Sequence, residues 1–229
     1  VITNLCEELG IGLENVVYIG DDVNDFEILS AVGLKACPAN AVDKMIKSIS
    51  DELKKLLAET GKKVEFGISP FAVYRTHSSI VENGWEKGSY NAASALQCYS
   101  ELYSDVYKWM AEGWIDYVVP QLYWEIGKKV ADYKTLAYWW AQHASETCKV
   151  YIGMAPFHLG EEKGAAAWRE GNEICRQLRL NRTIPGITGE CYFRTCDLVN
   201  NRCNLTDSLK QVFYPTYVPA PRKKTSVIQ

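Results

Sequence analysis

The sequence predicts an α/β protein made of successive β-α units with parallel strands. Short apolar runs bounded by turn residues alternate with helical segments, which is the pattern of a wound parallel sheet. The later units number four, which is half of a (β/α)8 barrel. Aromatic residues divide the chain, because all seven Trp lie from Trp85 to Trp168, whereas residues 1–63 hold only Tyr18 and Phe26. We therefore expect a partial (β/α)8 barrel with an appended Rossmann-like β-α-β fragment.

The predicted organisation is a fragment over residues 1–50, a half-barrel over residues 51–219 and an irregular tail over residues 220–229. In the fragment, glycines and Pro38 mark the ends of three helices and two strands. The helices cover residues 1–10, 24–32 and about 42–59, and the strands cover residues 16–19 and 34–37.

The half-barrel is predicted to contain four strands separated by helices. Its strands cover residues 64–69, 115–119, 149–154 and 187–193, and its helices cover residues 99–112, 132–147 and 168–181. Asp132 is a suitable N-cap for the second of these helices, because its side chain can accept a first-turn N–H. The tryptophans at 109, 114, 139 and 140 are expected in the core.

Composition excludes several classes of protein. The chain has 229 residues, a net charge of −3 and no dense Lys/Arg face, so we expect no nucleic-acid partner. It contains no apolar run near the ~20 residues of a membrane span, and no signal peptide is visible. Its eight cysteines form no C-x-x-C pair. For the group of Cys191, Cys196 and Cys203 we expect reduced, buried thiols rather than a metal site.

An acidic loop follows the first predicted strand. Residues 20–25 read Gly-Asp-Asp-Val-Asn-Asp and place three carboxylates at the carboxyl end of that strand. Clustered oxygen ligands suit Mg²⁺, which would neutralise a transferring phosphoryl group. The alternative is that Asp22 or Asn24 caps the following helix and the other residues are solvated.

This loop and residues 32–41 resemble the last motif of haloacid-dehalogenase-superfamily sugar-phosphate phosphatases, and of the related domain of acylneuraminate cytidylyltransferases. The resemblance covers about residues 1–48 and implies that Asp21 binds Mg²⁺ directly, with Asp25 in support. The nucleophilic Asp of that family lies N-terminal to this motif, before Val1. The expectation is therefore a fragment without phosphatase activity.

A second group of candidate functional residues lies at the carboxyl ends of the four predicted strands. Active sites of (β/α)8 barrels form where these strand ends meet the following loops. Aromatic rings with a few polar groups at one rim suit a sugar. The alternative is that the rings only fill space between strands and helices. The candidate ligand contacts are Ser69, Arg75, Gln121, Tyr123, Trp124 and His158, and the candidate catalytic carboxylates are Glu125 and Glu190.

The second part is identified as a member of the glycosyl-hydrolase-like 10 family, on motifs between Phe66 and Gly153 that include Pro120-Gln121-Leu122-Tyr123-Trp124. The resemblance implies a bacterial (β/α)8 protein acting on cell-wall or other glycan, with no cofactor. The acidic pair expected after the fourth barrel strand, in an Asp-Asp-Tyr context, is absent, because this chain begins its barrel at the fifth strand. Asp116 starts a strand and is expected to be structural.

The helix over residues 42–59 can belong to either part, so we place the junction near residues 47–51 and interpret the chain as a chimera. Three functions follow: a residual glycosidase, a non-catalytic carbohydrate binder, or a Mg²⁺ phosphatase. We expect the leading fragment to continue the sheet of the half-barrel, and a partner chain is a candidate for completing the barrel. The two resemblances imply different compartments, cytoplasmic and exported.

Overall fold

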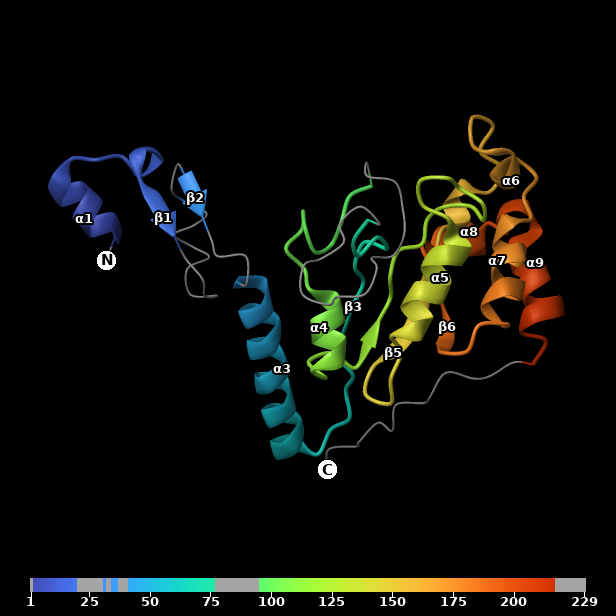
Figure 1. The fold of residues 1–229 in the computed structure, drawn as a ribbon, viewed down its shortest axis with the longest axis horizontal. Coiled ribbons are helices and arrows are strands. Elements are labelled where there is room, and N and C mark those ends of the chain that lie inside the picture. The colour runs from blue at the N-terminus through green and yellow to red at the C-terminus, as the bar shows by residue number, and fades with distance from the viewer. Residues whose placement is uncertain (1, 20–30, 32–33, 37–40, 77–94, 217–229) are drawn as a thin grey trace, which may run out of the picture.

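A computed structural model describes residues 2–19, 31, 34–36, 41–76 and 95–216 (Figure 1). Its architecture is α/β with parallel strands, which confirms the predicted fold class. The leading fragment contains α1 (Ile2–Leu9), β1 (Val17–Ile19) and β2 (Leu34–Ala36), and β1 pairs with β2 in parallel. The helix predicted over residues 24–32 lies outside the described residues, apart from residue 31.

A single helix connects the leading fragment to the rest of the chain. Helix α3 (Ala41–Thr60) runs for 20 residues and crosses the predicted junction at residues 47–51 without a break, as expected. It docks on the later part through Val42 and Ile46, which pack against the core, and through polar contacts. Lys108 donates to the Asp43 carboxylate at 2.7 Å, and Lys54 donates to the Gly113 carbonyl at 2.8 Å.

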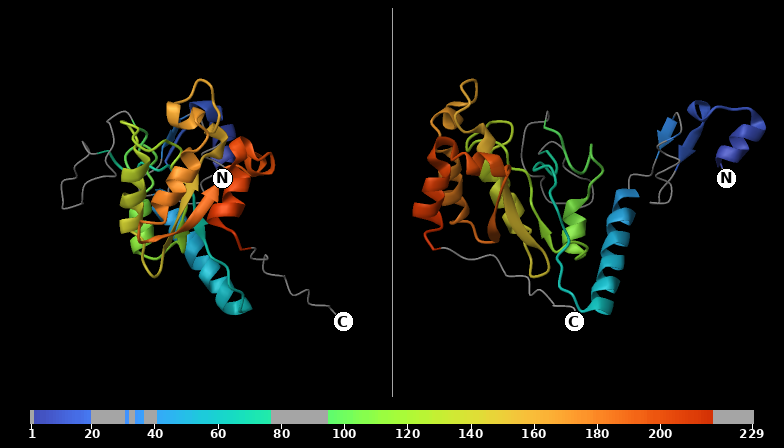
Figure 2. Two further views of the ribbon diagram at one scale, coloured as in Figure 1. Left: turned by 90° about the vertical axis from the view of Figure 1, so that its right-hand side faces the viewer. Right: turned by 180° about the vertical axis from the view of Figure 1, so that it is seen from behind.

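The expectation that the leading fragment continues the sheet of the half-barrel is wrong. In the described residues, β1 and β2 form a two-stranded sheet of their own, separate from the four-stranded sheet. Helix α3 is the physical reason, because 20 residues at about 1.5 Å per residue span roughly 30 Å. In Figures 1 and 2 the β1–β2 unit lies beyond one end of α3, away from the later strands.

The four-stranded sheet confirms the predicted half-barrel pattern. Its strands are all parallel, follow the order β3-β4-β5-β6, and comprise β3 (Gly67–Ile68), β4 (Tyr117–Val118), β5 (Lys149–Met154) and β6 (Ile187–Tyr192). Strands β3 and β4 are shorter than predicted, mostly at their amino ends. Pro70 and Pro120, which have no N–H to donate, lie just beyond their carboxyl ends. Bridges of Gln121 with Phe71 and Gly153 continue the pairing beyond them.

The helices beside this sheet are shorter than predicted. They are α4 (Val106–Ala111), α5 (Tyr133–Gln142), α6 (Ala166–Arg169) and α7 (Glu173–Asn181). The prediction of a helix over residues 99–112 is wrong in its first half. Tyr103 has φ 51°, and the Asp105 side chain caps α4 by accepting the Lys108 N–H at 3.1 Å.

Two further boundaries differ from the prediction. The segment over residues 168–181 is two helices, because Gly171 with φ 74° separates α6 from α7. Helix α5 begins at the predicted cap, where Asp132 accepts the Thr135 N–H at 2.9 Å, but it ends at Gln142 rather than near Thr147. A turn closed by Ser145 and Cys148 follows, in which each N–H bonds the other residue at 3.0 Å.

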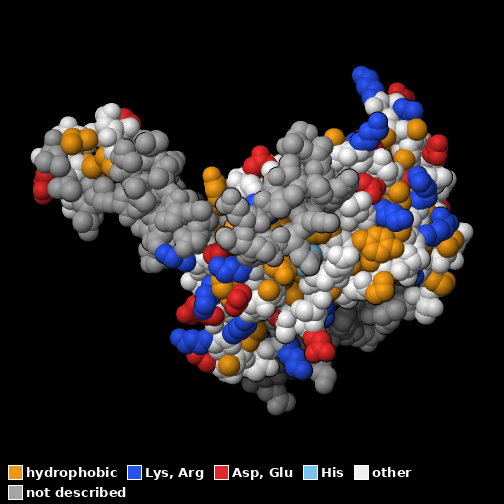
Figure 3. All heavy atoms as spheres, in the orientation of Figure 1, with side chains coloured by type: hydrophobic (Ala, Val, Ile, Leu, Met, Phe, Trp, Pro, Cys, Tyr) orange, Lys and Arg blue, Asp and Glu red, His pale blue; other side chains and the backbone are white. Residues whose placement is uncertain are grey.

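After β6 the chain forms short helical segments that were not predicted. These are α8 (Thr195–Val199), α9 (Leu205–Ser208), a 3-10 turn over residues 202–204 and a π-helical turn over residues 209–213. Another 3-10 turn, over residues 156–158, directly follows β5. Helix α9 packs against α7 and α8. No described helix is both long and apolar enough to cross a bilayer. On the face seen in Figure 3, the described Lys and Arg side chains are interspersed with Asp and Glu.

The core lies between one face of the four-stranded sheet and its helices. Val118, Val150, Ile152 and Met154 on that face have no solvent exposure. They pack in one cluster with side chains of α5 and α7, including Leu136, Trp140, Ile174 and Leu178. Trp109 and Trp140 are buried as predicted, and Trp114 and Trp139 are partly buried against the same cluster.

Asp116 has the structural role that was expected. Its carboxylate accepts the Phe66 N–H at 2.7 Å, and its own N–H donates to the Phe66 carbonyl at 2.7 Å. The Asp116 carbonyl also accepts the Lys149 N–H at 2.9 Å. This residue therefore ties the starts of β3, β4 and β5 together.

Replacing Asp116 with alanine should leave the partly buried Phe66 N–H without its acceptor. We expect the free energy of unfolding, measured by urea denaturation, to fall by about 1–3 kcal/mol. Glu65→Ala is the control, since it removes only an exposed ion pair with Lys149 and should leave the urea midpoint nearly unchanged. Equal losses in the two variants would contradict the role of Asp116.

Candidate functional site

A pocket of about 380 Å³ opens at the carboxyl ends of β4 and β5. This is the end of a barrel sheet at which active sites form. The loop after β4 and the longer loop after β5 supply its walls, and its lining residues are Tyr123, Trp124, Glu125, Lys128, His158, Glu161, Lys163, Gly164, Ala165 and Trp168. Four of the residues predicted from sequence, Tyr123, Trp124, Glu125 and His158, therefore share one pocket.

Glu125 is the best-anchored charged group in this pocket, with a side chain that is 14% exposed. Its carboxylate accepts the Trp168 indole N–H at 3.0 Å and the Lys128 ammonium at 3.2 Å. Burial alone would raise its pKa. Hydrogen bonds from its own backbone N–H and from Trp168 and Lys128, together with the Lys128 charge, outweigh burial and hold the pKa of Glu125 below its ordinary value.

The aromatic residues of the pocket belong to two ring clusters. Tyr123 stacks on Phe193 with centroids 5.9 Å apart and meets Phe157 edge-on at 5.8 Å. Phe193, directly after β6, is 54% exposed. Trp124 contacts Phe71 edge-on at 5.4 Å and is partly buried against the core. Tyr123 and Phe193 therefore present ring surface at the mouth, whereas Trp124 also serves packing.

His158 is held by a carboxylate and an indole. Its Nδ1 lies 2.8 Å from the Glu161 carboxylate, and its ring lies 5.2 Å from the Trp168 ring, centroid to centroid. Glu161 fixes the orientation of the imidazole, which leaves Nε2 as the polar edge that a ligand can meet. Trp168 thus contacts both Glu125 and His158 and joins the two sides of the pocket.

The other predicted contacts do not line this pocket. The Gln121 amide donates to the Ser69 carbonyl at 3.1 Å, and the Ser69 hydroxyl donates to the Val119 carbonyl at 2.8 Å. Both residues lie at the ends of β3 and β4, as predicted. The Arg75 guanidinium lies over the Tyr99 ring, 4.4 Å from its centroid.

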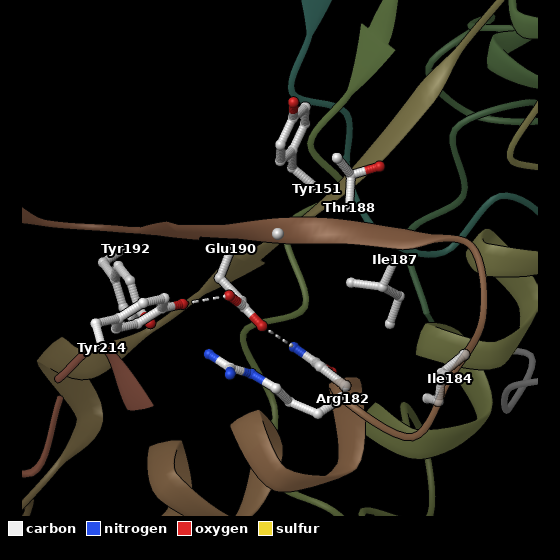
Figure 4. A pocket seen from close by; sticks show the side chains of 10 residues that line it. Tyr151, Arg182, Ile184, Ile187, Thr188, Glu190, Tyr192 and Tyr214 are labelled. Carbon is white, nitrogen blue, oxygen red and sulfur yellow. Dashed lines mark hydrogen bonds between the residues drawn. The ribbon is translucent and has the colours of Figure 1, made fainter. Parts of the chain in front are cut away.

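Glu190 lies away from the pocket, on the helix-facing side of β6. Its register partner Ile152 belongs to the buried face of β5. Figure 4 shows its carboxylate between Tyr214 and the end of α7. It accepts the Tyr214 hydroxyl at 2.6 Å and the Asn181 amide at 3.5 Å. The structure does not bring Glu190 together with Glu125.

Comparison with known proteins identifies the family. The sequence pattern of the family described as glycosyl hydrolase-like 10 matches residues 31–169, which is more than half of the chain. The chain belongs to this family. It is 33% identical over 181 residues to the glycosyl hydrolase YngK of Bacillus subtilis, which covers 78% of the chain and 33% of that protein. The glycosyl hydrolase DigH of Escherichia coli (strain K12) is 33% identical over 160 residues, 68% of the chain and 34% of DigH.

The chain spans about a third of the length of these glycosyl hydrolase-like relatives. The chain also has a shorter similarity to a different enzyme. The phosphoglycolate phosphatase of Methanopyrus kandleri is 47% identical to it over 60 residues, which are 26% of the chain and 25% of that enzyme. The joining of two ancestries stays a prediction. Asp21 and Asp25, the predicted Mg²⁺ ligands, lie outside the described residues.

The described residues contain no group of three or more His, Cys, Asp or Glu arranged to hold a metal. The cysteines at 191, 196 and 203 are free, as predicted, but they are exposed, so the expectation of buried thiols is wrong for them. Buried free thiols occur instead at Cys6, Cys98 and Cys148. Burial, the largest cause, raises the pKa of the Cys98 and Cys148 thiols to about 12, so they are unreactive.

Sequence reasoning missed six residues that line the pocket of this glycosyl hydrolase-like chain. They are Gly164, Ala165 and four with larger side chains: Lys128, Glu161, Lys163 and Trp168. Lys128 could have been predicted from the sequence, because it follows Glu125 by three residues. Trp168 was assigned to a helix, and it does lie in α6. Its role in the site depends on the fold of the loop after β5, which no local pattern predicts.

The lowered pKa of Glu125 predicts pH-dependent stability. Its ionised form contributes stability above the ordinary Glu pKa of about 4.3, and this contribution is lost as the pH falls through the lower folded value. Glu125→Gln should therefore be less stable than the parent by about 1 kcal/mol near neutral pH. The difference, measured by urea denaturation across pH, should disappear in acid.

Glu162→Gln is the matched control, because Glu162 is exposed on the neighbouring loop. It should leave the urea midpoint unchanged at every pH. A Glu125→Gln deficit that persists unchanged in acid would show that the loss comes from packing rather than from charge.

Proposed function

We propose that this chain binds glycan in the pocket at the carboxyl ends of β4 and β5. One observation carries the proposal: half-buried aromatic rings and a well-anchored carboxylate share a pocket at the strand ends where barrel enzymes act. Membership of a glycosyl hydrolase-like family and the names of YngK and DigH support a saccharide as the ligand. Bacterial cell-wall glycan is the substrate class we favour.

The pocket has suitable chemistry for a sugar. The apolar C–H face of a pyranose ring packs on the Tyr123 ring, and the adjoining Phe193 ring extends this surface. Sugar hydroxyls donate to the Glu125 carboxylate or accept from the Lys128 ammonium and the His158 ring. Because the pKa of Glu125 is lowered, this side chain is an acceptor at neutral pH and not a proton donor.

Hydrolysis of a glycosidic bond requires more than this one carboxylate. Two carboxyl groups normally flank the bond at about 5–9 Å from each other, and one must be protonated. Glu125 suits the ionised member of such a pair, whereas Glu190 accepts hydrogen bonds on the other side of the sheet. We therefore propose that the residues of this chain bind glycan without turnover.

Binding is tested by titrating soluble N-acetylglucosamine oligomers and following tryptophan fluorescence, since Trp124 and Trp168 line the pocket. We expect a saturable change. Tyr123→Ala should weaken binding at least about fivefold through loss of the ring surface. Tyr138→Ala is the matched control, because Tyr138 is 38% exposed on α5 and lies outside the pocket.

The same titration with maltohexaose, a glycan unrelated to the cell wall, serves as the comparison ligand. Reducing ends are measured in all samples, because their release reports hydrolysis. Equal weakening by the two tyrosine variants, or no saturable signal with any oligomer, would contradict the proposed site. Release of reducing ends that Glu125→Gln abolishes would overturn the proposal of binding without turnover.

We further propose that the acidic loop over residues 20–25 binds Mg²⁺ through Asp21, with Asp25 in support. The sequence Gly-Asp-Asp-Val-Asn-Asp and the similarity to the Methanopyrus phosphatase support this second role. Calorimetric titration with Mg²⁺ should give one site per chain that Asp21→Asn removes. Asp43→Asn on α3 is the control. Retained Mg²⁺ binding in Asp21→Asn would reject the assignment.

A further inference from the structure

We propose that Asp197 and Arg202 are positioning residues of the glycan pocket, because they hold the loop after β5 in place. The inference rests on the proposed glycan binding and extends it to side chains that do not line the pocket. Asp197 belongs to α8, and Arg202 belongs to the 3-10 turn that follows α8. The loop that they hold, over residues 155–168, is called the sugar-site loop below. It carries most of the residues that line the pocket.

The sugar-site loop has few anchors of its own. One backbone hydrogen bond joins its two halves, from the Gly160 N–H to the Trp168 carbonyl at 2.8 Å. The other backbone bonds within the loop join residues only three positions apart, and its tip at Glu162 and Lys163 is exposed. The second half is anchored by the bond from Trp168 to Glu125. The first half, with His158, needs a different anchor.

Arg202 supplies that anchor. Its Nε donates to the Leu159 carbonyl at 2.5 Å. Leu159 directly follows His158, and its side chain is buried in the core. A hydrogen bond donated by a charged guanidinium is roughly twice as strong as one between neutral groups. Arg202 therefore fixes the backbone next to the imidazole that a sugar would meet.

Asp197 holds Arg202 in turn. Its carboxylate is 6% exposed and accepts Arg202 Nη1 at 3.4 Å. The same carboxylate lies 3.7 Å from the Nε of Arg194, which directly follows Phe193. A carboxylate this buried is tolerated only with charged or hydrogen-bonding partners. One group therefore connects the loop that carries His158 with the strand end that carries Phe193, so two sides of the pocket mouth share it.

The turn after α8 also fits closely against the backbone of the sugar-site loop. A Cβ atom at Gly160 would lie 3.0 Å from Cys203 Sγ, and one at Gly171 would lie 3.1 Å from Cys203 Cβ. Both glycines have a left-handed φ, 73° and 74° respectively. Helix α8 itself packs against the 3-10 turn after β5. The segment after β6 therefore touches the loop at its start, at its neck and just beyond its end.

The alternative role for Asp197 and Arg202 is stabilisation of the fold alone. Asp197 lies in the first turn of α8, where the helix dipole favours a carboxylate. This alternative predicts a lower free energy of unfolding with unchanged sugar affinity. Positioning predicts the reverse, because the Arg202 side chain is 36% exposed and partly exposed ion pairs contribute little to global stability.

Binding of N-acetylglucosamine oligomers to the full chain, followed by tryptophan fluorescence, separates the two roles. Arg202→Met keeps the apolar stem and removes both hydrogen bonds, so the affinity should fall at least about fivefold. Its midpoint in urea should stay close to that of the parent. Lys210→Met is the matched control, because it removes a cation that is exposed on the π-helical turn. It should bind the oligomers as the parent does.

A double-mutant cycle shows whether Arg202 acts through the sugar-site loop. His158→Ala should itself weaken binding. Arg202→Met added to it should weaken binding by less than about twofold more, because no imidazole is left to position. Asp197→Asn should weaken binding in the same direction as Arg202→Met, and the two together should be less than additive, since they break the same contact. Circular dichroism confirms that each variant is folded.

Three results would overturn the inference and leave the proposed sugar site standing. They are parental affinity in Arg202→Met, parental affinity in His158→Ala, and full additivity of these two changes. A loss of affinity in Lys210→Met as large as that in Arg202→Met would overturn it too, since any lost cation would then act alike. If the parent chain shows no saturable binding, the proposed function fails, and the inference fails with it.

Discussion

At Gly153 two backbone segments come so close that no side chain fits between them. A Cβ atom at this position would lie 2.8 Å from the Pro120 carbonyl oxygen. Gly153 donates to that carbonyl at 2.9 Å, and its own carbonyl accepts the Leu122 N–H at 3.0 Å. These two bonds continue the β4–β5 pairing past Pro120, which itself donates nothing. The following residues, Tyr123 to Glu125, are thereby held over the end of β5, beside the loop that carries His158.

Buried polar side chains of α7 also hold the loop after β4 in place. Glu173 and Gln177 have no solvent exposure. Both carboxylate oxygens of Glu173 and the amide nitrogen of Gln177 are hydrogen-bonded, whereas Gln177 Oε1 has no partner among the described residues. The Glu173 carboxylate accepts the Ile126 N–H at 2.8 Å, and the Gln177 amide donates to the Trp124 carbonyl at 2.9 Å. The backbone on both sides of Glu125 is therefore fixed by one helix, so the carboxylate meets Trp168 without having to order a flexible loop.

The sequence predicted those features of the fold that depend on residues close together in the chain. Strand β5 was predicted with its observed bounds, the Asp132 cap was correct, and the strand-end rule selected four residues of one pocket. The face of Glu190 could not be predicted, because the register shifts between Val150 and Tyr151 where β6 pairs with β5. One extra residue exchanges the two faces of a strand, and its presence depends on the neighbouring strand. Trp168 reaches Glu125 across 43 residues, which no periodicity encodes.

The face of the four-stranded sheet that points away from the helices alternates large and small residues, as a barrel interior does. A Cβ at Gly67 would lie 2.4 Å from the Tyr117 ring, and one at Gly189 would lie 3.2 Å from the Tyr151 ring. Each glycine therefore leaves room for a tyrosine of the adjacent strand. Barrel interiors are filled by such layers, contributed by alternate strands. The glycines of β3 and β6 and the tyrosines of β4 and β5 therefore fit together as side chains do in the layers of a barrel interior.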